Sequence, residues 1–210
     1  MKRIAIFLAA LVLATPTFAQ VIPGAGYVNS SLKSASSSDS QNGFYAGASV
    51  EMGVTAVKGL SFVPGAYLSM ITSTGTSSGD FWIISGSSKS TFTELAVNVP
   101  AYLKYGLELS GGARIFAYAG PTAQIGIISQ VKTDTTTSGI ISGSSTNTKD
   151  YYAGDSGFNR FNLYLGGGLG FGFGKFSINA GYDYGLLNVM RGVDSNANRA
   201  NLHVGVSYML

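Results

Sequence analysis

The sequence predicts an all-β protein, an eight-stranded antiparallel up-and-down transmembrane β-barrel, and three observations favour this fold. Segments of roughly ten residues with alternating apolar character recur along the chain, as in barrels that turn one face to lipid. Only 11% of the residues are charged, whereas 29 are glycine, 12 phenylalanine and 12 tyrosine. Short turns alternate with long polar connections. After residue 20 no apolar run approaches the roughly 18 residues of a spanning helix, which excludes a helical membrane protein.

Residues 1–19 are predicted to be a secretory signal peptide. Lys2 and Arg3 precede an apolar run, and Thr17 and Ala19 supply the small residues that a signal peptidase requires. Residues 20–210 are then expected to form one barrel domain, with about as many basic as acidic residues, so the basic pI does not indicate nucleic-acid binding. The chain has no Cys, which excludes disulfides, thiolate chemistry and a lipidated cysteine.

Eight segments carry the alternating pattern, and an even number suits a closed barrel. They lie at about residues 24–32, 43–55, 59–72, 92–106, 112–130, 159–173, 175–189 and 199–210. The short connections are residues 56–58, 107–111 and 174–175, and the long ones are residues 33–42, 73–91, 131–158 and 190–198. This asymmetry predicts that both termini lie at the short-turn end, which is periplasmic in barrels of this kind.

Charged residues within the strands fall on one parity, opposite to the apolar stripe. A Lys or Arg facing lipid near the midplane would cost about 2–4 kcal/mol, so these side chains are expected in the lumen. In the sixth strand Gly166, Gly168, Gly170 and Gly172 share the inner parity and leave room for large residues opposite, which predicts a packed interior. The expected polar network of the lumen comprises Glu51, Glu94, Lys104, Arg114, Asp183 and His203.

We interpret this network as a salt-bridged plug, because buried charges are normally paired. The alternative is a constriction that selects small solutes, or a proton-linked site. Asp183 and His203 are expected to face each other, but no nucleophile elbow marks a catalytic serine. One His without Cys cannot assemble a transition-metal site, and the glycine run lies inside a strand with no helix after it. No catalytic, cofactor-binding or metal-binding residue is therefore predicted, and no cofactor.

The long connections are the best candidates for interaction. Phe81, Trp82, Ile83 and Ile84 form an apolar, β-prone centre between polar flanks, and the fragment IISGSS occurs at residues 83–88 and again at 140–145. We expect these connections to form hairpins that extend the barrel and to pair with each other. They either pack only on themselves or dock on a host protein, a cell or a membrane surface. Trp82 could instead belong to the interfacial aromatic belt.

The closing segment NLHVGVSYML (201–210) places five apolar residues at a period of two. In a closed barrel this stripe faces lipid, and the strand pairs on both sides, so no edge remains free. The ending with Tyr208 and Leu210 also resembles the signal that the barrel-assembly machinery recognises, although that signal usually ends in Phe.

Several stretches resemble the outer-membrane β-barrel domain proteins, often called porin-family proteins and abundant in Bacteroidota. They are GFYAGASVEM (43–52), LSFVPGAYLSM (60–70), NVPAYLKYGL (98–107), FAYAGPTAQIG (116–126) and FSINAGYDYGLLNV (176–189). The similarity runs in order over the whole mature chain. It implies an eight-stranded barrel of the OmpA/OmpX type in the outer membrane of a Gram-negative bacterium.

The sequence therefore favours a non-enzymatic protein with a structural or adhesin-like role through its long outer loops. The alternatives are a very small porin or channel and, more distantly, an outer-membrane lipid-modifying enzyme. Expected partners are outer-membrane lipid, the barrel-assembly machinery and an unidentified surface or host ligand, but no nucleic acid. The protein is expected to be a monomer.

Overall fold

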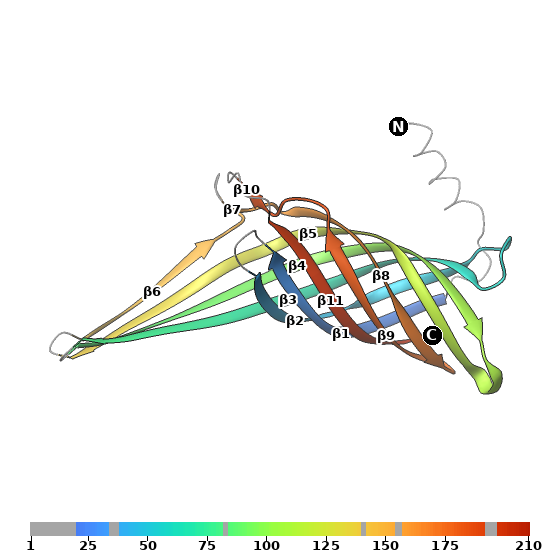
Figure 1. The fold of residues 1–210 in the computed structure, drawn as a ribbon, viewed down its shortest axis with the longest axis horizontal. Helices are drawn as coiled ribbons and strands as arrows, with labels where there is room; N and C mark the ends of the chain where they lie inside the picture. Colours follow the sequence, from blue (N-terminus) through green and yellow to red (C-terminus); the bar gives the residue numbers. More distant parts are fainter. Residues whose placement is uncertain (1–19, 34–37, 82–83, 140–141, 154–156, 192–196) are drawn as a thin grey trace.

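Eight long antiparallel strands close into a barrel (Figure 1). The computed structural model describes residues 20–33, 38–81, 84–139, 142–153, 157–191 and 197–210, so the predicted signal peptide lies outside the described residues. Each barrel strand pairs with the next along the chain, and the first pairs with the last. The predicted fold class is thus confirmed. The barrel strands are β1 (Gln20–Lys33), β2 (Ser38–Gly53), β3 (Leu60–Phe81), β4 (Ile84–Glu108), β5 (Ala113–Gly139), β8 (Phe161–Phe173), β9 (Phe176–Gly185) and β11 (Asn198–Tyr208).

The remaining elements are short or lie outside the barrel. A 3-10 turn, η1 (Ser110–Gly112), joins β4 to β5, and β6 (Gly143–Asp150) pairs with the outer part of β5. Two short strands, β7 (Gly157–Phe158) and β10 (Met190–Arg191), form a separate two-stranded sheet. Within the described residues no helix is long and apolar enough to span a membrane.

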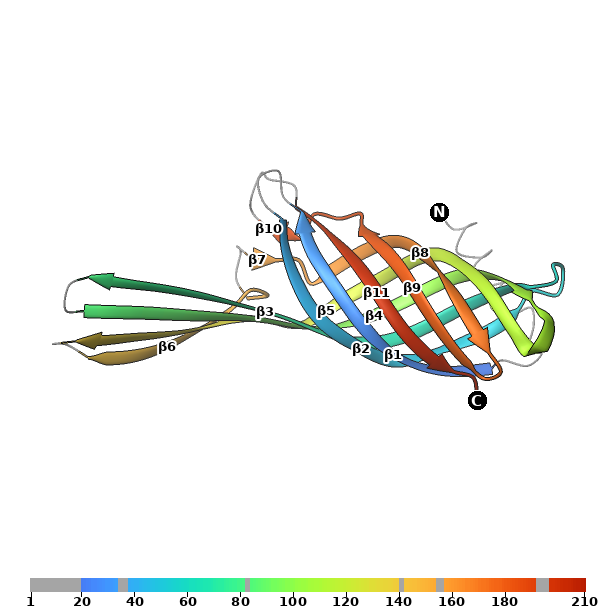
Figure 2. The same cartoon turned by 60° about the horizontal axis from the view of Figure 1, so that its bottom comes forward.

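Three barrel strands continue far beyond the barrel wall. β3, β4 and β5 contain 22, 25 and 27 residues, so the stretches 73–91 and 131–158 are largely strand where the alternation alone placed connections. The outer parts of β3 and β4 pair with each other up to Phe81 and Ile84, and β4 pairs with β5 up to Gly139. β6 pairs with the other side of β5, so the strand order of the extension is β3-β4-β5-β6. The predicted hairpins and their mutual pairing are therefore confirmed. We call residues 73–81, 84–92, 131–139 and 143–150 the protruding sheet (Figure 2).

The protruding sheet has two free edges within the described residues. β2 stops pairing with β3 at Asn42 and Thr72, so β3 has no partner on that side beyond this point. On the other side, β6 pairs only with β5. The strands remain regular because Thr is β-branched and favours extended backbone, and cross-strand hydroxyl pairs such as Ser90 Oγ and Thr133 Oγ1, 3.1 Å apart, add hydrogen bonds.

The outside of the barrel is apolar, as the parity of the strands predicts. Phe44, Leu169 and Phe176 are 69%, 69% and 68% exposed. One β-bulge interrupts the alternation: Leu95 pairs with Ile128 and Ala96 with Gly126, which leaves Ile127 as an extra residue in β5. Because a bulge shifts the side chains that follow to the other face, Ile127 and Ile128 both point outward and Ser129 is buried.

The glycines of β8 make room for large side chains in the lumen. A Cβ on Gly168 would collide with Tyr118, one on Gly170 with Phe116, and one on Gly172 with Arg114. The prediction that the inner glycines of the sixth predicted strand leave room for large residues is therefore confirmed.

The closing strand β11 lies between β1 and β9, so it has no free edge. Leu202, Val204 and Val206 are 52%, 51% and 59% exposed and belong to the outer apolar surface. The backbone N–H of Leu210 donates to the carbonyl of Val21, 3.1 Å away, so the start of β1 and the end of the chain meet at the short-turn end. The role of Tyr208 and Leu210 in assembly stays a prediction.

Candidate functional site

The polar residues of the lumen surround a cavity of about 180 Å³. Five of the six predicted network residues line it, and Glu51 lies beside it, bonded to the lining residue Lys104. The predicted packed interior is therefore wrong in part, because the side chains of the lumen leave this cavity unfilled. The lining includes five tyrosines, Tyr45, Tyr67, Tyr102, Tyr118 and Tyr164.

A buried ion pair blocks the lumen at the end from which the protruding sheet rises. Arg199 donates from both terminal nitrogens to Glu94, with Nη2 and Oε2 2.9 Å apart. The two side chains are only 4% and 2% exposed. A bidentate pair fixes both groups in place, so this pair is a barrier in the lumen.

Amide and hydroxyl groups continue the network just below this pair. The Tyr164 hydroxyl donates to Gln124 Oε1 at 2.9 Å, Gln124 Nε2 donates to Asn98 Oδ1 at 3.0 Å, and Asn98 Nδ2 donates to Ser69 Oγ at 2.7 Å. The chain of bonds runs along the inner wall over four neighbouring strands, from β8 through β5 and β4 to β3. It links the four strands through their inner faces.

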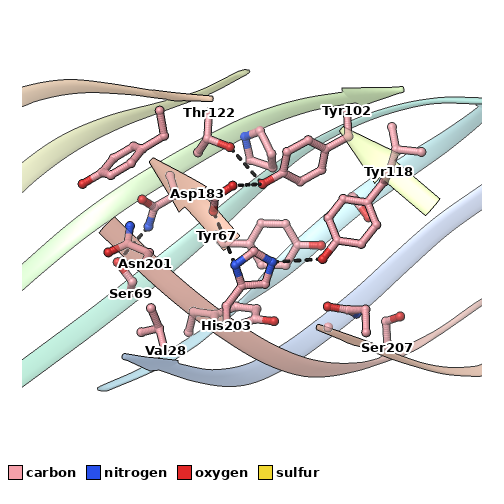
Figure 3. A pocket seen from close by; sticks show the side chains of 18 of the residues that line it. Val28, Tyr67, Ser69, Tyr102, Tyr118, Thr122, Asp183, Asn201, His203 and Ser207 are labelled. Carbon is pink, nitrogen blue, oxygen red and sulfur yellow. Dashed lines mark hydrogen bonds and ion pairs between the residues drawn. The ribbon is translucent and has the colours of Figure 1, made fainter. Parts of the chain in front are cut away.

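At the middle of the barrel Asp183 and His203 face each other, as the sequence predicts (Figure 3). His203 Nδ1 lies 3.4 Å from Asp183 Oδ2, and His203 Nε2 lies 3.0 Å from the Tyr118 hydroxyl. The other carboxylate oxygen accepts from the Tyr102 hydroxyl at 3.3 Å, which in turn accepts from Thr122 Oγ1 at 3.0 Å. Both ring nitrogens of the histidine thus have partners, and no serine is positioned as a nucleophile in this chain of bonds.

The lumen is less tightly closed toward the short-turn end. Lys104 Nζ lies 2.5 Å from Glu51 Oε2, with side chains 11% and 14% exposed, and 4.8 Å from the centre of the Phe116 ring. Arg114 extends along β8 over Gly172, and its Nη2 donates weakly to Ser177 Oγ at 3.4 Å. Its Nε is buried and has no hydrogen-bond partner.

Side chains from the segment that follows β6 cover the Glu94–Arg199 pair. We call the end of the lumen at this pair the upper end. The Phe158 ring centre lies 5.9 Å from the guanidinium carbon of Arg199, and Phe158 stacks on Tyr151 with the ring centres 5.2 Å apart. Tyr152 is buried against Gly126. Burial raises the pKa of its phenol, and the nearby Glu94 carboxylate acts in the same direction. A neutral aromatic lid therefore lies over the barrier.

Two features of this site were not predicted from the sequence. Arg199 shares the inner parity with Asn201 and His203, so the alternation of β11 would have identified it as a lumen residue. Tyr152 and Phe158 lie in a connection without periodicity, and no pattern there indicates a lid. The described residues contain no group of three or more His, Cys, Asp and Glu that could hold a metal ion.

Two of the four predicted apolar interaction residues, Phe81 and Ile84, lie at the end of the described part of the protruding sheet. The backbones of Phe81 and Ile84 pair with each other where β3 meets β4. Trp82 and Ile83 lie outside the described residues, so the structure does not test the role of this tip.

Comparison with known proteins agrees with the fold. The model of a family described as "Outer membrane protein beta-barrel domain" matches residues 17–191. No curated protein matches the sequence. Among solved structures, Ail of Yersinia pestis, in complex with the heparin analogue sucrose octasulfate, is 15% identical with a TM-score of 0.42, and the match covers 92% of this chain and 100% of that one.

Two further solved structures are similar at a comparable level. Neisserial surface protein A is 13% identical with a TM-score of 0.45, over 90% of this chain and 97% of that one. The outer membrane enzyme PagL is 10% identical with a TM-score of 0.37, over 91% and 99%. The family model spans most of the sequence, and its description agrees with the barrel that the strands form. The chain therefore belongs to the outer membrane protein beta-barrel domain family and is a β-barrel protein of the Gram-negative outer membrane.

Proposed function

We propose that this protein is an adhesin-like surface protein that binds its partner through the protruding sheet. The observation that carries the proposal is that three barrel strands, joined by β6, continue past a barrel whose lumen contains the buried Glu94–Arg199 pair. Residues 73–81 of β3 alone would reach about 30 Å beyond the barrel at roughly 3.3 Å per residue. A purely structural barrel has no need of an ordered extension of this length.

The free edges of the protruding sheet suit recognition of an extended segment of another protein. An edge strand presents unpaired backbone N–H and C=O groups that can add a further strand. Every residue of β6 is exposed, and neither β6 nor residues 73–81 contain a proline that would block the edge. The charged residues of β6, Lys149 and Asp150, lie at its base. Most of the β6 edge therefore lacks the prolines and charged side chains that prevent the addition of a further strand.

In this proposal both termini lie in the periplasm and the protruding sheet lies outside the cell. Outer-membrane lipid surrounds a monomeric barrel, which the barrel-assembly machinery inserts. The proposal gives the Asp183–His203 pair no catalytic role, because the Tyr118 hydroxyl, and not a serine, lies against His203 Nε2. The proposed Bacteroidota origin rests on the sequence resemblance.

A very small pore is the second candidate, since the lumen retains a cavity of about 180 Å³. Its cross-section is interrupted by the buried Glu94–Arg199 pair under an aromatic lid. We therefore expect the purified protein to show no stable open state in planar bilayers. A reproducible open state of the wild-type barrel would favour the pore.

The adhesin proposal is tested by removing the protruding sheet. One variant replaces residues 73–91 and 131–149 by short Asn-Gly turns, and a milder variant replaces residues 81–84 by serine. Both are expected to keep the heat-modifiable mobility of a folded barrel on gels while cells lose attachment to host-cell or matrix surfaces. A Lys58→Ala variant in the short turn before β3 serves as the control. Undiminished attachment of the first variant would refute the proposal.

A further inference from the structure

The two ends of the lumen differ in how completely their charged side chains are buried. At the upper end Glu94 and Arg199 are 1% and 3% exposed, and Tyr164 is 1% exposed. At the short-turn end Lys104 rises to 9%, and both Arg114 and Ser207 are only half-buried. The polar lining is therefore more exposed at the short-turn end than at the ion pair, although Ser177 and Phe116 there are only 5% and 9% exposed.

Arg114 lines this cavity at its short-turn end and forms no salt bridge with an acidic residue. Among the described residues, Glu51 pairs with Lys104 and Glu94 with Arg199, but no ion pair includes Arg114. Glu108 is its neighbour across β4 and β5, yet it is exposed and does not form a salt bridge with it. Arg114 therefore has no ion-pair partner among the described residues, and its buried Nε still has a hydrogen bond to donate.

The residues around Arg114 add hydroxyl donors and an apolar wall. The strand register connects Arg114 through Gly172 to Ser177 and then to Ser207, all in one row around the barrel. Because Gly172 has no side chain, the guanidinium can lie against β8 and point into the lumen instead of into solvent. The same cavity is lined by the apolar side chains Ile22, Val63 and Phe116.

We propose that this cavity binds a small aliphatic carboxylate from the short-turn end, with the carboxylate on Arg114 and the hydrocarbon part against the apolar wall. The planar guanidinium matches a carboxylate through two parallel N–H···O bonds. Ser177 and Ser207 can donate to the remaining lone pairs. A cavity of about 180 Å³ suits a short chain and excludes a long one.

The test is titration of the folded, isotope-labelled protein in detergent micelles with butyrate, followed by NMR of Phe116, Ser177 and the Arg114 Nε–H. Butyrate should cause saturable shifts, whereas 1-butanol and butylamine should not. Arg114→Gln should weaken binding at least about tenfold, as expected for loss of charged hydrogen bonds. Arg114→Lys should retain only part of the affinity for butyrate, because lysine keeps the positive charge but cannot make the two parallel hydrogen bonds of a guanidinium.

The matched control is Lys132→Gln, which removes one positive charge from an exposed strand of the protruding sheet and should leave butyrate binding unchanged. Heat-modifiable gel mobility verifies folding of each variant. The proposal is overturned if butyrate gives no saturable shift, if butanol binds equally well, or if Arg114→Gln binds butyrate as the wild type does. None of these results depends on attachment through the protruding sheet.

Discussion

Replacing Arg199 by Met is the perturbation with the largest expected effect on barrel stability. The variant keeps a long apolar stem beneath Phe158 but leaves Glu94 charged and unpaired, and that side chain is only 2% exposed in the wild type. Removing one partner of a buried ion pair costs about 3–5 kcal/mol. That loss is a large share of the roughly 5–15 kcal/mol that stabilises a typical domain.

The assay is reversible urea unfolding of the barrel in lipid vesicles, with the double variant Glu94→Gln/Arg199→Met completing a thermodynamic cycle. The single variant should lose about 3–5 kcal/mol of unfolding free energy, and the double variant should recover most of that loss because no buried charge remains. If Arg199→Met costs less than about 1 kcal/mol, or if the two substitutions are additive, the ion pair does not hold the upper lumen together.

Three further predictions concern the wall, the lipid face and the closing strand. Gly166→Val should prevent folding, because its Cβ would collide with Asp183, whereas Gly75→Ala in the protruding sheet, where nothing lies within 4 Å, should fold normally; gel mobility distinguishes them. Leu169→Arg should cost about 2–4 kcal/mol in vesicle unfolding, since this exposed side chain lies on the lipid-facing side of β8. A polar tail added after Leu210 should reduce insertion into the outer membrane, measured by cell fractionation, and unchanged insertion would mean that the apolar stripe serves lipid contact alone.

The sequence predicts the barrel well because lipid imposes a strict rule on each strand. Alternation identifies the eight strands, and the inner parity of Glu94, Lys104 and Asp183 is the parity that the structure has. Asp183 and His203 also meet as expected, because register follows from the strands on either side of one connection.

The sequence does not predict where the strands of the protruding sheet end or how the upper lumen closes. Outside lipid, Ser and Thr can occupy either face of a strand, so alternation disappears although the ladder of hydrogen bonds continues through residues 73–81. The alternation also gives no sign of the bulge at Ile127, because Ile127 and Ile128 are both apolar. The lid of Tyr152 and Phe158 depends on contacts with Gly126 and Arg199, which are distant in the sequence, and a local periodicity cannot predict such contacts.

The most direct test of the account is cysteine labelling on intact cells, which is clean because the wild-type chain has no Cys. Ser87→Cys places a thiol on an exposed position of the protruding sheet, and Ser110→Cys places one at an exposed position of the short-turn end. A membrane-impermeant maleimide should label Ser87→Cys on intact cells and Ser110→Cys only after the outer membrane is opened. Labelling of Ser110→Cys alone on intact cells, or protection of Ser87→Cys, would contradict an outward-facing protruding sheet and with it the proposed function.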